Sequence, residues 1–65
     1  MNEIIEILMR RDQISEEEAW SMVNQCQEEL NYIIGAGGPY IYEEAEEFLA
    51  DYLGLEPDYL IYFLS

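Results

Sequence analysis

Several residue types that commonly carry chemistry are scarce or missing in this chain of 65 residues. The sequence has no histidine, two basic residues and one cysteine, Cys26. Histidine and lysine supply most general bases and amine nucleophiles, and the chain contains neither, so we predict that it is not an enzyme. A single cysteine excludes an intramolecular disulfide. The helical pattern around Cys26 predicts a buried thiol, which suits a reducing compartment.

Long apolar runs are missing as well. A helix needs about 20 apolar residues to span a bilayer, and the sequence has no such stretch. Its first residues also lack the long apolar segment and small-residue cleavage site of a signal peptide. We therefore expect a soluble cytoplasmic protein without a membrane partner. Because so short a chain hides only about 60% of its unfolded surface, we expect a homodimer to add stability.

Negative charge is what the chain has in excess. Fifteen acidic residues stand against Arg10 and Arg11, for a formal net charge of −13. Such a surface repels nucleic acid and attracts a basic protein. High acidity can accompany disorder, but 51% of the residues are hydrophobic and 14% are aromatic, so we predict a folded protein.

The spacing of apolar residues predicts an all-α fold, with residues 1–65 as a single helical domain. Three to four short helices are expected around one core, at residues 2–11, 16–34, 41–53 and 57–64. The second helix begins with a capping box at Ser15 and Glu18, and it ends at a glycine-rich segment. It should run antiparallel to the third helix, with the last helix folded over both. We expect four residues of the third and last helices in the core: Phe48, Tyr52, Leu60 and Phe63.

A β-hairpin is the competing interpretation of the middle of the chain. It pairs residues 32–34 with 40–42 across the glycine-rich segment, because these residues are β-branched or aromatic. Pro39 and the helical pattern on both sides favour the two helices.

Two short motifs point to ligands at first sight. Phosphate-binding loops follow a strand and carry a lysine, whereas the glycines at 35, 37 and 38 follow a helix and have no lysine, so we interpret them as a helix stop. The acidic run 43–47 has the helical spacing of carboxylate ligands, but di-iron helices also need histidine. We predict neither a cofactor nor a resident metal.

Exposed carboxylates form the first candidate site. Carboxylates four residues apart on a helix are separated by about 6 Å of rise, the same order as the phosphate spacing of a duplex. They would imitate a nucleic-acid backbone and contact arginines and lysines of a partner, although a solvated face that only keeps the protein soluble is the alternative. The predicted contact residues are Glu43, Glu44, Glu46, Glu47 and Asp51, together with Glu17, Glu28 and Glu29.

Aromatic side chains form the second candidate site. The chain has more of them than so small a core encloses, and tyrosine is enriched at protein interfaces. The predicted contacts of a homodimer or partner are Tyr32, Tyr40, Tyr42, Tyr59 and Tyr62.

Two resemblances bear on function. Residues 50–60 resemble the helix-turn-helix of bacterial regulators, but the second helix has no basic or amide side chain to contact DNA. In size, charge and lack of catalytic residues, the chain is similar to phage counter-defence proteins, including anti-CRISPR and anti-restriction inhibitors. That likeness implies a non-enzymatic inhibitor that occupies the basic channel of a nuclease or CRISPR-type complex. The alternative is a small interaction or regulatory module that acts through its aromatic, apolar surface.

Overall fold

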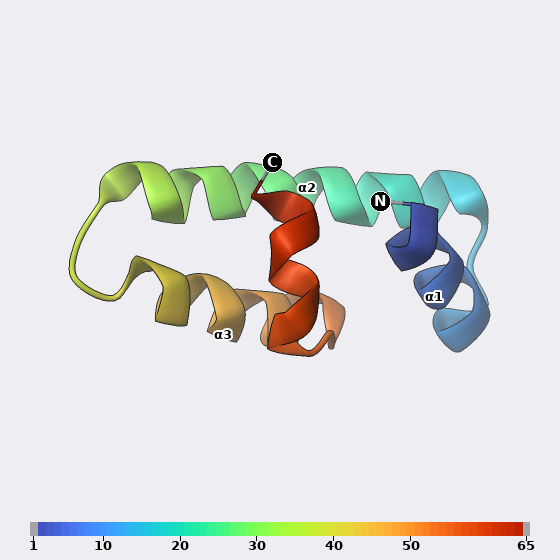
Figure 1. Cartoon of the computed structure of the whole chain (residues 1–65). Coiled ribbons are helices and arrows are strands. Elements are labelled where there is room, and N and C mark those ends of the chain that lie inside the picture. The colour runs from blue at the N-terminus through green and yellow to red at the C-terminus, as the bar shows by residue number, and fades with distance from the viewer. Residues whose placement is uncertain (1, 65) are drawn as a thin grey trace.

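The fold consists of one long helix with three shorter helical elements beside it (Figure 1). The computed structural model describes residues 2–64, so the ends of the predicted domain, Met1 and Ser65, lie outside the described residues. The elements are α1 (Asn2–Asp12), α2 (Glu16–Ala36), α3 (Ile41–Leu53) and the 3₁₀ helix η1 (Pro57–Phe63). The predicted all-α class is confirmed.

The helices α1 and α3 pack against α2, and η1 packs mainly against α3. In Figure 1, α3 runs antiparallel to α2 beneath one half of it, α1 lies at the other half, and η1 rises from the end of α3 toward α2. The molecule is therefore elongated, with extents of 36 × 19 × 18 Å. The predicted antiparallel pairing of the second and third helices is confirmed.

Local interactions explain where α2 begins and where it ends. The backbone N–H of Glu18 donates to Ser15 Oγ at 3.1 Å, which is the serine half of the predicted capping box. The Glu18 carboxylate accepts a hydrogen bond from the Ser15 hydroxyl at 3.4 Å. The helix runs to Ala36, beyond the predicted end near residue 34, and stops at Gly37, which has a φ of 75°. The hairpin alternative is wrong, because residues 32–34 are helical and 41–42 begin α3.

One apolar core joins all four elements. Cys26 and Leu30 of α2 are fully buried, which confirms the predicted burial of the Cys26 thiol. Within α1 the structure buries Ile5 and leaves Ile7 half-buried. The buried side chains are Ile4, Ile5, Leu8, Ala19, Val23, Cys26, Leu30, Ala45, Leu49, Leu53, Leu55, Leu60 and Phe63.

Two of the four predicted core residues of the third and last helices lie elsewhere. Leu60 and Phe63 are buried as predicted, but Tyr52 is 39% exposed and Phe48 is half-buried. The rings of Phe48 and Tyr52 stack on each other at the edge of α3, and the Tyr52 hydroxyl donates to Gln25 on the surface of α2. The hydroxyl group needs a polar partner, and that partner keeps Tyr52 out of the core.

The helix η1 is apolar nearly all round but is covered on one side only. Leu60 and Phe63 face the core. Side chains three residues apart line up in a 3₁₀ helix, so Ile61 and Leu64 share another row. These two are 68% and 43% exposed, so they leave an apolar surface uncovered. The segment that resembles a helix-turn-helix thus ends in a helix whose buried residues serve packing.

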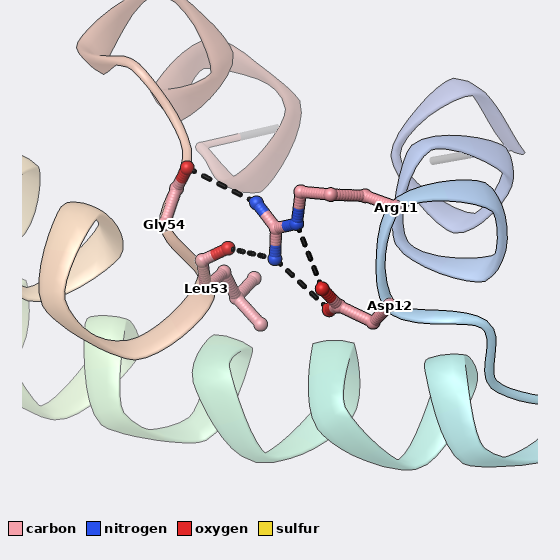
Figure 2. Close-up of polar contacts among 4 residues, drawn as sticks. All are labelled: Arg11, Asp12, Leu53 and Gly54. Carbon is pink, nitrogen blue, oxygen red and sulfur yellow. Dashed lines mark hydrogen bonds and ion pairs between the residues drawn. The ribbon is translucent and has the colours of Figure 1, made fainter.

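Arg11 joins α1 to the end of α3 (Figure 2). Its guanidinium donates to the carbonyl oxygen of Leu53 at 2.6 Å and to that of Gly54 at 3.1 Å. It also forms an ion pair with Asp12, with Nε 2.9 Å from Oδ1. The carbonyls at a helix C-terminus lack partners within the helix and attract cations, so Arg11 satisfies a need of α3. Gly54, with a φ of 67°, supplies the left-handed residue that ends α3.

Side-chain hydrogen bonds also hold η1. The hydroxyl of Tyr62 donates to Glu3 Oε2 of α1 at 2.7 Å. The amide of Gln27 donates to the carbonyl oxygen of Phe63 at 2.9 Å, which ties η1 to α2. The last helix is therefore fixed to both neighbouring helices, as well as to the core through Leu60 and Phe63.

Candidate functional site

Four of the predicted contact residues share one face of α3, which we call the α3 acidic face: Glu43, Glu44, Glu47 and Asp51. All four side chains are exposed. They lie across the helix from the buried row of Ala45, Leu49 and Leu53, which packs toward α2. Glu43, Glu47 and Asp51 follow one another at intervals of four residues, so successive carboxylates stand one turn apart.

Glu46 does not belong to this face. It is half-buried, whereas the four members of the face are exposed. Successive residues of an α-helix are about 100° apart around its axis, so Glu46 lies on the flank of α3. Its neighbour there is Tyr42, which precedes it by one turn. The sequence had grouped it with its neighbours because an acidic run does not separate the sides of a helix.

The predicted contact residues on α2 lie at different places around that helix. Glu17 and Glu28 are exposed and stand across the helix from the buried stripe that contains Val23 and Cys26. That stripe is the side of α2 on which α1 and α3 pack, so Glu17 points away from α3, whereas Glu28 reaches the edge of a hollow between α2 and α3. The structure therefore does not bring all of the predicted carboxylates onto one face.

Glu29 lies on the flank of α2 that borders α3. With Gln25, Glu28, Phe48 and Tyr52 it lines a hollow of about 390 Å³, which we call the α2–α3 groove. We had not predicted Phe48, Tyr52 or Gln25 as functional residues. The sequence does contain a cue, because Gln25 and Glu29, like Phe48 and Tyr52, are four residues apart and therefore neighbours on one side of a helix. Only the structure shows that these two pairs face each other.

The carboxylates of the α3 acidic face have no cation beside them among the described residues. Within residues 2–64, the ion pair of Arg11 with Asp12 is the only one. The hydrogen bond from Arg11 lowers the pKa of the Asp12 carboxyl, and the charge of Arg11 acts in the same direction. Both arginines of the chain belong to α1. The α3 acidic face therefore forms no ion pair with residues 2–64.

The predicted tyrosine site separates into two groups. Tyr32, Tyr40 and Tyr42 are 74%, 60% and 58% exposed. Tyr59 and Tyr62 are half-buried against the core, and their rings stack with centroids 6.1 Å apart. These two serve packing of η1 within the chain, so Tyr32, Tyr40 and Tyr42 are the ones that remain accessible.

Tyr42 belongs to an exposed apolar surface that also includes Ile61 and Leu64 of the C-terminal segment. Tyr42 and Leu64 line one depression of about 350 Å³, with Ile34 and Phe63 at its floor. Leu64 shares its row with Ile61. We call these three residues the η1 apolar face.

Cys26 is placed where a reactive thiol is not expected. Its side chain is buried in α2, and burial raises the pKa of the thiol to about 11. At neutral pH it is therefore protonated and a poor nucleophile. Across residues 2–64, no three His, Cys, Asp or Glu side chains come together as metal ligands.

Known proteins give no further guidance. Comparisons with models of protein families, with curated proteins and with solved structures found no match. None of the helices in residues 2–64 has the length and apolar character that crossing a membrane requires.

Proposed function

We propose that this chain is a non-enzymatic binding protein that engages a basic protein surface with its α3 acidic face. The observation that carries the proposal is the set of four exposed carboxylates on one side of α3, none of which is paired with a cation within residues 2–64. A basic partner supplies the missing cations and is attracted from a distance by the net charge of −13.

Stability gives an independent reason to assign a role to these carboxylates. Like charges three or four residues apart destabilise a helix by a few tenths of a kcal/mol per pair. The spacing of Glu43, Glu47 and Asp51 produces two such pairs, and Glu44 with Glu47 produces another. A domain of this size has little stability to lose, and solubility does not require the charges to stand on one face.

The partner we propose is a nucleic-acid-binding protein of a bacterial defence system, such as a nuclease or a CRISPR-type complex. Successive carboxylates of the α3 acidic face are about 6 Å apart along the helix, which is the order of spacing of backbone phosphates. The protein would act in the cytoplasm by occupying the channel that nucleic acid normally fills. No contact with nucleic acid itself is proposed, because the two would repel each other.

The test is to immobilise the chain and capture proteins from a bacterial lysate at low salt. We expect the captured protein to bind nucleic acid and to be released both by high salt and by duplex DNA. DNA competes because it occupies the same basic channel, and salt screens the ionic contacts. A captured partner that resists both salt and DNA would contradict the proposal.

A second candidate function rests on the η1 apolar face. Ile61 is 68% exposed and Leu64 is 43% exposed beside Tyr42, so this face suits a homodimer or an apolar partner, with the acidity serving solubility. Tyr59 and Tyr62 are unsuitable for testing it, because they pack against the core.

Two pairs of substitutions separate the candidates. On the second candidate, Ile61→Ser with Tyr42→Ser abolishes binding or dimerisation, and Glu43→Lys with Glu47→Lys leaves it intact. On the first candidate, the outcomes are reversed. Sedimentation of the chain alone, before and after the apolar pair is changed, reports the dimer directly.

A further inference from the structure

We infer that the α2–α3 groove receives an arginine side chain of the basic partner. This inference rests on the proposed function, and it names the group that the partner inserts. One wall of the groove has aromatic rings and the other has carboxylates. Both features suit a guanidinium group, which stacks on aromatic rings and donates hydrogen bonds to carboxylates.

The aromatic wall belongs to α3. The rings of Phe48 and Tyr52 are nearly parallel, at 11°, with their centroids 5.3 Å apart. The Tyr52 hydroxyl donates to Gln25 Oε1 at 2.6 Å, which fixes the orientation of the outer ring. Tyr52 is 39% exposed although its ring is apolar, so ring surface remains available to a ligand. A preorganised ring loses little freedom when a ligand stacks on it.

The opposite wall belongs to α2 and supplies the charge. Gln25 and Glu29 are one turn apart on the same flank, with Glu28 beside them at the rim. Both glutamates are exposed, and the only ion pair within residues 2–64 lies elsewhere, at Arg11 and Asp12. An entering cation therefore meets carboxylates that have no competing cation within the described chain.

Arginine fits this groove better than lysine. Its guanidinium is flat, stacks on aromatic faces, and donates two parallel hydrogen bonds to a carboxylate. An ammonium group is a compact charge that holds its water more strongly and gains less from a ring. A neutral apolar side chain would leave the carboxylates of Glu28 and Glu29 without a partner.

The test uses short peptides and the full chain. Acetyl-Gly-Arg-Gly-amide is titrated into the isotope-labelled protein at low salt, and amide shifts are recorded by NMR. Matched peptides carry lysine or citrulline, which has nearly the shape of arginine but no charge. We expect shifts centred on Gln25, Glu29, Phe48 and Tyr52, weaker ones with lysine and none with citrulline.

Variants then assign the contacts. Tyr52→Leu should weaken arginine binding by about two- to five-fold, as expected for loss of a cation–π contact, whereas Tyr52→Phe should keep most of it. Glu29→Gln, at an exposed position, should weaken binding without affecting the fold, which circular dichroism checks. Shifts centred on the α3 acidic face, equal binding of citrulline, no binding at all, or indifference to both Tyr52→Leu and Glu29→Gln would overturn the inference.

The outcome for the groove is separate from the outcome for the proposed function. If Tyr52→Leu leaves the affinity for the captured partner unchanged while loss of α3 carboxylates abolishes it, the groove inference fails and the proposed function stands. If no basic protein binds at all, the proposed function fails, and the peptide titration still reports on the groove.

Discussion

Single side chains join helices that are far apart in the sequence, and Arg11 is the clearest case. One guanidinium group contacts the last carbonyls of α3 and the neighbouring Asp12 (Figure 2). The contact links residues more than forty positions apart, so it constrains how α1 sits against the turn between α3 and η1. One of only two cations in the chain is thus committed to structure.

Replacing Arg11 should therefore weaken folding. We expect Arg11→Gln to lower the free energy of unfolding by about 1 to 2 kcal/mol, because charged hydrogen bonds to helix-end carbonyls are lost. The midpoint of urea unfolding, followed by circular dichroism, measures the change. Arg10→Gln is the matched control and should change stability by no more than about 0.5 kcal/mol. Equal effects of the two substitutions would show that the contacts of Arg11 do not stabilise the fold.

The hydrogen bond of Tyr62 makes the stability of the protein depend on pH in the alkaline range. Its hydroxyl donates to Glu3, and this hydrogen bond, reinforced by the negative charge of Glu3, raises the pKa of Tyr62 above its ordinary value of 10.0. A raised pKa in the folded state means that the contact stabilises the protein below the pKa of the unfolded tyrosine. That stability is lost as the pH rises through the folded pKa.

The stability difference between the wild type and Tyr62→Phe should accordingly be constant up to about pH 10 and shrink above it. Titration of tyrosinate absorbance should show one tyrosine that ionises late. In Glu3→Gln this late ionisation should move to lower pH, because both the charge and the carboxylate acceptor are lost. A titration curve that is identical in the two proteins would contradict the assigned cause.

At the scale of helices, α3 combines an apolar row with a row of unpaired carboxylates. A lysine at position 47 would stand one turn from both Glu43 and Asp51 and would turn two repulsions into two attractions. We expect Glu47→Lys to raise the free energy of unfolding by about 0.5 to 1 kcal/mol and to weaken binding of the basic partner.

Glu28→Lys provides the control for stability. It makes the same change of charge on an exposed part of α2 that has no acidic residue three or four positions away. Urea unfolding of the two variants should separate them, with stabilisation in Glu47→Lys alone. If Glu47→Lys destabilises the protein, the carboxylates of the α3 acidic face do not repel one another as described.

The elements were predictable from the sequence to a large extent. The apolar periods, the Ser15 cap and the glycines at the helix ends are local signals, and they give the four helices. The packing of Tyr52 was not predictable, because its position depends on Gln25 in another helix. The contacts of Arg11 were not predictable either, because its acceptors are backbone carbonyls, which are present in every sequence.

The candidate site was predictable only in part, for a reason that belongs to the whole molecule. Helical spacing indicates which residues are exposed but not how one helix is turned relative to another. It therefore grouped Glu17 with the α3 acidic face, although Glu17 stands on the side of α2 that points away from α3. The same limit concealed the α2–α3 groove, whose two walls come from different helices.

The measurement that tests the central claim most directly compares two variants of equal charge against the purified partner. One carries Glu43→Gln, Glu44→Gln and Glu47→Gln on α3, and the other carries Glu6→Gln, Glu16→Gln and Glu17→Gln at the other end of the molecule. Each set removes two carboxylates from the first turn of a helix, so the loss of favourable interaction with the helix dipole is matched. Affinity is measured over a range of salt concentrations. We predict that only the α3 variant loses affinity and salt dependence; equal losses in both variants would show that net charge alone, and not the α3 acidic face, governs binding.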